Sequence, residues 1–91
     1  MDILDFSESS FQNINEFKEC MRYGGEVEFE WKGVHYGVVR YGKDQKITIY
    51  EAYKPESEKV CETADDALDY MLGTDRFRDV LSQVTILFRS V

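Results

Sequence analysis

The chain contains one histidine, His35, and a glutamate, Glu30, stands five positions before it. If the residues between them form a tight hairpin, the two side chains are cross-strand neighbours with Cβ atoms about 4.5–5.5 Å apart. Such a pair, with Tyr50 nearby, could act as a general acid and base, and a small enzyme of this kind would need a concave pocket around His35. The alternative is a surface ion pair worth about 0–1 kcal/mol. Because an open sheet face excludes water poorly, we expect the ion pair and assign no catalytic residues.

Three glutamates alternate along the residues before this hairpin, at positions 26, 28 and 30. Alternate residues of a strand lie about 7 Å apart, so their carboxylates do not converge as the ligands of a hard cation must. One histidine and two cysteines are also too few for a zinc site built from four cysteines, or from two cysteines and two histidines. We therefore expect no metal and no other cofactor. The row instead suits an edge strand, where charge discourages association between sheets.

The two cysteines differ in their predicted surroundings. Cys20 falls near an apolar helical stripe and is expected to act as a small buried hydrophobe. Cys61 precedes a predicted helix start, a position that can lower the pKa of a thiol. No base can be placed beside it, so a nucleophilic role is not expected. We expect free thiols, although the sequence leaves a Cys20–Cys61 disulfide open.

The 91-residue chain has a net charge of −7 and an isoelectric point near 4.6. Nucleic-acid binding depends on positive charge, so we expect no binding to nucleic acid or to an anionic membrane. The N-terminus lacks the basic start and apolar run of a signal peptide, and no stretch approaches the roughly 18 apolar residues of a membrane span. These features predict a cytoplasmic protein of one domain, residues 1–91, in which residues 1–8 form an extension.

A helix is predicted over residues 10–22, capped by Ser9 or Ser10 and ended by Gly24-Gly25. Its apolar residues recur at helical spacing and define a buried stripe: Phe11, Ile14, Phe17 and Met21.

Three strands are predicted next, over residues 26–31, 34–41 and 46–53. The Lys32-Gly33 pair predicts a two-residue hairpin loop. That loop places Trp31 opposite Val34 and puts every apolar residue of both strands on one face, which fixes the register. The following loop sets Val38 beside Ile49, and it sets Tyr50 beside Gly37 on the opposite face.

The remaining segments complete a predicted two-layer α+β fold in the order α-β-β-β-α-α-(β), with a three-stranded antiparallel meander packed on helices. Residues 54–59 read as an exposed loop. Thr63 is expected to cap a helix whose buried stripe is Ala64, Ala67, Leu68 and Met71 and which ends at Gly73. Thr74 is expected to cap a shorter helix that buries Phe77, Val80 and Leu81. Residues 84–88 could continue that helix or form a final strand, and we favour the strand.

Charged side chains on these two helices are expected to stay at the surface. Asp65, Asp66 and Asp69 are interpreted as a solvated helix start. On the shorter helix, i,i+3 ion pairs are expected, Asp75 with Arg78 and Arg76 with Asp79.

The solvent-side face of the sheet is the candidate site. The predicted register gathers aromatic and apolar side chains there, with a rim of glutamates and Thr48. The residues assigned to protein binding are Glu28, Glu30, His35, Val39, Tyr41 and Tyr50. Aromatic side chains with a charged rim are typical of a protein-binding patch. Two other interpretations remain open: the N-terminal segment, with Ile3, Leu4 and Phe6, covers this face, or the face forms a homodimer.

These observations favour a non-enzymatic protein-interaction domain. The acidity allows a narrower version, an inhibitor or immunity-type protein whose target is a basic protein such as a nuclease.

Three segments, GGEVEFEWKGVHYGV, KITIYEAY and TADDALDYMLGTDRFRDVL, together resemble a type of small acidic protein from Gram-positive bacteria. That type has a helix, a hairpin of the form EFE-aromatic-x-G, a third strand, and an acidic helix that leads to a second short helix. The resemblance covers residues 11–82. It implies the same α+β fold and a bacterial source, and it carries no activity and no catalytic residues.

Overall fold

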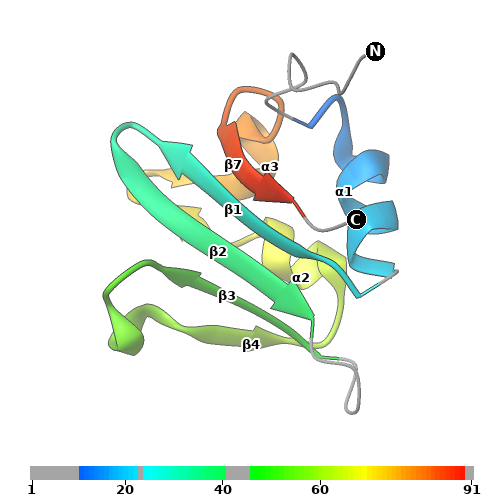
Figure 1. Cartoon of the computed structure of the whole chain (residues 1–91), viewed down its shortest axis with the longest axis horizontal. Coiled ribbons are helices and arrows are strands. Elements are labelled where there is room, and N and C mark those ends of the chain that lie inside the picture. Colours follow the sequence, from blue (N-terminus) through cyan, green and yellow to red (C-terminus); the bar gives the residue numbers. More distant parts are fainter. Residues whose placement is uncertain (1–10, 23, 41–45, 90–91) are drawn as a thin grey trace.

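The computed structural model describes residues 11–22, 24–40 and 46–89. In these ranges the elements follow one another as α1 (Ile14–Arg22), β1 (Glu26–Trp31), β2 (Val34–Arg40), β3 (Ile47–Glu51), the 3-10 helix η1 (Pro55–Ser57), β4 (Lys59–Cys61), α2 (Ala64–Leu68), β5 (Met71–Leu72), β6 (Asp75–Arg76), α3 (Phe77–Val80) and β7 (Thr85–Arg89). Five strands form one antiparallel sheet in the order β4-β3-β2-β1-β7, and β5 and β6 form a separate pair (Figure 1). The predicted α+β fold is confirmed.

The β1–β2 hairpin has the predicted register. Lys32 and Gly33 both have positive φ values, 53° and 81°, which is the backbone of a type I′ turn. This turn matches the twist of the two strands, so pairing runs without interruption from Trp31 opposite Val34 to Glu26 opposite Val39. The chain therefore alternates its side chains between two faces as the apolar pattern predicted.

The next pairing also agrees with prediction, because β3 places Ile49 opposite Val38 and Tyr50 opposite Gly37. Strand β2 is thus the middle strand of the β1–β2–β3 meander.

The sheet extends beyond this meander at both sides. Residues 85–89 form the favoured final strand, β7, which pairs with β1. The prediction that residues 26–31 form an edge strand is therefore wrong. On the other side, residues 59–61 form β4 beside β3, within and just after the stretch predicted to be an exposed loop. The β1–β7 pairing could not be predicted because it joins segments far apart in the sequence. Strand β4 follows β3 closely but is only three residues long, and its charged surroundings indicated a loop.

Helix α1 begins later than predicted, at Ile14. The side chain of Asn13 accepts a hydrogen bond from the backbone N–H of Glu16 (2.9 Å), as an N-cap residue does. The predicted capping residues, Ser9 and Ser10, lie outside the described residues. At the other end Gly24 has φ +75° and terminates the helix as predicted.

Helix α2 is shorter than predicted. Thr63 caps it as expected, since its Oγ1 accepts from the backbone N–H of Asp66 (3.1 Å). The helix ends at Leu68, however, and Met71 is 48% exposed on strand β5 instead of buried on the helix. Gly73, with φ +70°, lies in the turn between β5 and β6.

Tertiary hydrogen bonds explain this change of structure after α2. The hydroxyl of Tyr70 donates to the backbone oxygen of Ser57 (2.8 Å), and the N–H of Phe77 donates to the oxygen of Tyr70 (2.9 Å). These bonds close a small hairpin where the spacing predicted further helix. Thr74 therefore does not cap a helix; α3 begins at Phe77, and its N-cap residue is Arg76.

The core lies between the helices and one face of the five-stranded sheet. In Figure 1, α2 and α3 lie behind the sheet. Phe77 of α3 stacks on Phe29 of β1 (ring centroids 4.8 Å apart, planes at 6°) and meets Phe17 of α1 edge to face (5.3 Å). Phe29 also stacks on Tyr36 (5.3 Å). These rings join the helical and strand segments into one core, and the opposite face of the sheet carries the candidate site.

Candidate functional site

The sheet face opposite the core is termed here the outer face. It consists of the outward side chains of β1, β2 and β3, with those of β4 and β7 beside them. Across the first three strands, Glu28, Gly37 and Tyr50 are aligned in one row, and Glu30 lies opposite His35 in the next. Val39 lies opposite Glu26 in the row on the other side of Gly37. The structure thus brings five of the six predicted contact residues onto one face; the sixth, Tyr41, lies outside the described residues.

His35 and Glu30 are cross-strand neighbours, as predicted, but they are not hydrogen-bonded. The His35 Nε2 atom is 3.9 Å from Glu30 Oε1, and the imidazole side chain is 54% exposed. The two side chains are thus exposed cross-strand neighbours, and His35 also lines the hollow described below.

Sequence reasoning missed the apolar margin of the outer face. Leu87 and Phe88 of β7 and Val60 of β4 are each about half exposed, and Tyr53, just after β3, is 98% exposed. Phe88 lies opposite Glu28, and the register shifts between Glu28 and Phe29, so that Leu87 is an extra residue in the ladder. The apolar run at 84–88 was visible in the sequence; its position beside β1 was not.

A hollow of about 250 Å³ opens on the outer face between β1, β2 and the end of β3. It is lined by Glu28, His35, Tyr36, Gly37, Tyr50, Ala52, Tyr53 and Leu87. Ala52 has a small side chain, so the surface sinks where larger neighbours surround it. The end of the Tyr50 ring lies over Gly37, in the space that a Cβ atom there would fill. A second hollow, of about 280 Å³, lies on the other side of Tyr50 and Tyr53.

Tyr53 has an unusual backbone conformation, with φ +66°. A bulky residue rarely adopts positive φ, and the conformation costs on the order of 1–3 kcal/mol. Hydrogen bonds on both sides of the turn hold it: Lys54 N–H donates to the Glu51 oxygen (3.2 Å), and Ala52 N–H donates to the His35 oxygen (2.8 Å). The turn therefore fixes the backbone of Tyr53, whose side chain is exposed at the edge of the hollow.

Thr48 was expected on the acidic rim of this face, but it is buried. Its neighbours across the sheet, Val39 and Val60, belong to the same row. That end of the outer face is therefore more apolar and less polar than predicted.

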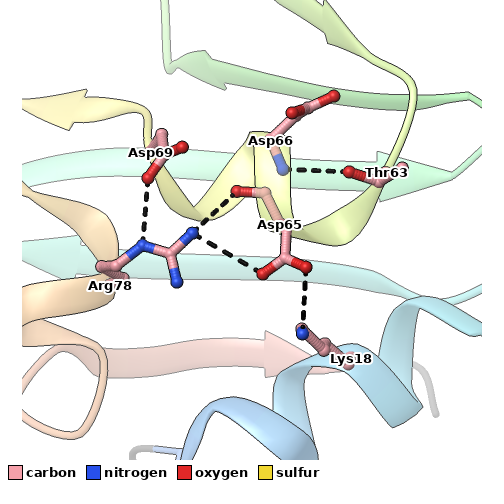
Figure 2. Close-up of polar contacts among 6 residues, drawn as sticks. All are labelled: Lys18, Thr63, Asp65, Asp66, Asp69 and Arg78. Carbon is pink, nitrogen blue, oxygen red and sulfur yellow. Dashed lines mark hydrogen bonds and ion pairs between the residues drawn. The ribbon is translucent and has the colours of Figure 1, made fainter.

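The acidic residues of α2 form ion pairs with neighbouring helices (Figure 2). Asp65 accepts from Lys18 of α1 (3.1 Å), and Arg78 of α3 bonds Asp69 (3.0 Å) as well as the backbone oxygen of Asp65 (3.1 Å). The hydrogen bond from Lys18 holds the pKa of Asp65 below its ordinary value. The three aspartates are exposed, as expected of a solvated helix start. Asp65 and Asp69 in addition link α2 to α1 and α3.

The predicted i,i+3 ion pairs on α3 are absent from the described residues. Asp75 instead accepts a hydrogen bond from the indole Nε1 of Trp31 (2.9 Å) and pairs with Lys32 (3.1 Å). The Trp31 hydrogen bond, aided by Lys32, keeps the pKa of Asp75 below its usual value. This contact ties the tip of the β1–β2 hairpin to β6.

Both cysteines are buried and free. Burial raises the pKa of Cys20 and of Cys61, so the helix that follows Cys61 does not lower the pKa of its thiol. The reason is its position in β4, where desolvation of the thiolate outweighs the positive charge of Lys59. Neither thiol has the electropositive, accessible surroundings of a reactive cysteine.

Within the part of the chain that the structure describes, no group of three or more histidine, cysteine, aspartate or glutamate side chains could hold a metal ion. No helix of that part is long and apolar enough to cross a membrane. Comparisons with protein-family models, with curated proteins and with solved structures found no match to this chain. Function must therefore be argued from the side chains themselves.

Proposed function

We propose that this chain is a non-enzymatic protein-interaction domain whose contact surface is the outer face. The observation that carries the proposal is the joint exposure of apolar and acidic side chains on one sheet face. Tyr53 is almost fully exposed, Leu87 and Phe88 are about half exposed, and all three lie near Glu28. Exposed apolar patches rimmed by charge are typical of protein-binding surfaces, and tyrosine and phenylalanine are enriched at the centres of interfaces.

The charge of the outer face supports a basic partner. On β1, β2 and β3 the outward side chains include three glutamates, Glu26, Glu28 and Glu30, and no lysine or arginine. A complementary positive surface would gain both specificity and association rate from this arrangement. The narrower interpretation, an inhibitor or immunity-type protein with a basic target, has the same electrostatic support.

The same charge argues against a homodimer through this face. A two-fold dimer contact is isologous, so each copy would present the same glutamates to the other. Like charges brought together at an interface are unfavourable. A partner of opposite charge fits the face better than a second copy does.

A matched pair of variants tests the proposal. Phe88 on the outer face and Met71 on the β5–β6 hairpin are almost equally exposed, 47% and 48%. Phe88→Ser and Met71→Ser therefore remove comparable apolar surface from two different places. Wild type and the two variants are each immobilised and exposed to an extract of the source cells. We expect immobilised wild type and Met71→Ser to retain a partner protein that immobilised Phe88→Ser does not retain.

Light scattering on the same three proteins tests self-association. A wild-type dimer that Phe88→Ser converts to a monomer would replace the proposed basic partner with a second copy. Identical sets of bound proteins for all three baits would contradict the assignment of the outer face.

A further inference from the structure

The hollow on the outer face has the size of one side chain. Pockets for drug-sized ligands usually enclose about 300–1,000 Å³, whereas this hollow measures about 250 Å³. It lies on the outer face, where the small side chain of Ala52 leaves space between larger neighbours. A side chain projecting from a partner protein fits such a depression better than a free cofactor does.

The lining of the hollow favours a cation. Tyr50 and Tyr53 offer aromatic rings, and cations are attracted to the faces of such rings at up to about 6 Å from the centroid. Glu28 lines the same hollow, and across residues 11–22, 24–40 and 46–89 its carboxylate has no ion pair or hydrogen bond with a described partner. Leu87 adds an apolar wall that suits the methylene stem of a long basic side chain.

We propose that this hollow is a receptor for an arginine side chain of the partner protein, stacked on Tyr50 and Tyr53 and paired with Glu28. The proposal rests on the proposed function, because it names the chemistry that the outer face would recognise. Arginine is chosen over lysine because its planar guanidinium is weakly hydrated, stacks on aromatic faces and pairs with a carboxylate at the same time. The ammonium of lysine is a more strongly hydrated point charge.

The conformation of Tyr53 is consistent with a recognition role. Its positive φ is unfavourable for tyrosine and would suit glycine, and its side chain is almost fully exposed. The ring thus contributes little to the core, while the backbone holds it at the edge of the hollow. Replacing Tyr53 by glycine should relieve the backbone strain at this position and should also remove one wall of the arginine-binding hollow.

The direct test uses small probes. N-acetyl-arginine amide is titrated into the isotope-labelled protein while backbone amide shifts are recorded, with N-acetyl-lysine amide and the neutral isostere N-acetyl-citrulline amide in parallel. We expect saturable shifts in the low-millimolar range at Gly37, Ala52 and Leu87 with arginine, weaker binding of lysine, and no saturation with citrulline.

Three variants test the assigned residues. Glu28→Gln should weaken arginine binding about two- to fivefold, the range that an exposed ion pair contributes. Glu19→Gln removes the same charge from α1 and should change nothing. Tyr53→Gly should raise the thermal midpoint and yet weaken binding about two- to fivefold, the range of an exposed cation–π contact. Replacing a residue that has only a structural role would not raise the stability of the protein and lower its affinity for arginine together.

Several results would overturn the proposal: shifts that do not saturate, equal effects of Glu28→Gln and Glu19→Gln, or binding of lysine as tight as that of arginine. These failures are separate from a failure of the proposed function. If Phe88→Ser still abolishes partner capture while the arginine probe does not bind, the outer face is the interface and the receptor is wrong. If Phe88→Ser leaves capture unchanged, the proposed function itself is wrong.

Discussion

Replacing Gly37 with alanine should destabilise the protein, although alanine is ordinarily the better residue in a strand. A Cβ atom at this position would lie 2.8 Å from Cε2 of Tyr50, and Cζ and Oη of the same ring would be nearer still. Contacts of a Cβ atom below 3.0 Å essentially do not occur. The ring of Tyr50 must therefore swing away from the middle strand that it covers, a cross-strand arrangement known to stabilise sheets that contain glycine.

The expected magnitude is the difference of two opposing effects. Overpacking a core typically costs about 1–3 kcal/mol. The atoms displaced here are the far end of a partly exposed side chain, so the lower half of that range, about 1–2 kcal/mol, applies. Removing glycine from a strand interior recovers roughly 0.5–1 kcal/mol, because the unfolded chain then has fewer conformations to lose. The net loss for Gly37→Ala is thus about 0–1.5 kcal/mol, and the midpoint of thermal unfolding should fall by about 4–8 °C for each kcal/mol.

A double-mutant cycle isolates the contact with Tyr50. Unfolding by denaturant is measured for wild type, Gly37→Ala, Tyr50→Ala and the double variant. Without the ring the three atoms nearest to the new Cβ atom are gone, so Gly37→Ala should stabilise the Tyr50→Ala protein by roughly 0.5–1 kcal/mol. The effect of one substitution thus changes sign between the two backgrounds. If it costs the same in both, or stabilises both, the ring does not occupy the position above Gly37 and the reasoning is refuted.

Three further predictions concern the core, the hairpin tip and the thiols. Phe77→Ala should lower the free energy of unfolding by about 3–5 kcal/mol, because it empties a fully buried ring site with two aromatic neighbours; a loss under about 1 kcal/mol by denaturant titration would contradict that packing. The pKa of Asp75 is lowered by the Trp31 hydrogen bond, so its stabilising effect is present above the ordinary aspartate pKa and is lost as pH falls through the folded value. Acidification from about pH 5 to pH 3 should then lower the thermal midpoint less in Asp75→Asn than in wild type; equal slopes would refute this. Cys20 and Cys61 should resist a thiol reagent at pH 7 until the protein unfolds, since burial raises both pKa values; fast labelling of the native protein would show that one of them is accessible.

The sequence predicted best where local chemistry decides the structure. The hairpin is the clearest example, because Lys32-Gly33 predicts a two-residue turn. A shift of one residue in the pairing would also turn every apolar side chain of both strands to the wrong face. The position of Tyr50 over Gly37 followed from that register and from the length of the next loop. The face that carries most of the predicted contact residues was therefore within reach of sequence reasoning.

Prediction failed where distant contacts override a local pattern. The spacing from Ala64 to Met71 is helical, yet hydrogen bonds of Tyr70 with Ser57 and Phe77 accompany the end of the helix at Leu68. The helical spacing from Ala64 to Met71 contains no sign of these partners, which lie outside that window.

The hollow was missed for a related reason. It needs Leu87 beside β1, which only the pairing of the last strand provides, and it needs the turn that holds Tyr53 at positive φ. A lone tyrosine in the segment EAYKP gives no sign of that conformation.

The pairing of β1 with β7 has a consequence for the order of folding. The β1–β2–β3 meander joins neighbouring segments, whereas β1 and β7 come from distant parts of the described chain. Contacts of long sequence separation form late because closing the intervening loop is entropically costly. Strand β1 is then transiently an open edge in the partly folded chain, and its alternating glutamates guard that edge against pairing with other molecules during the interval. Native-state amide exchange would reveal the same hierarchy as faster exchange in β7 than in β2, and equal protection of the two strands would argue against it.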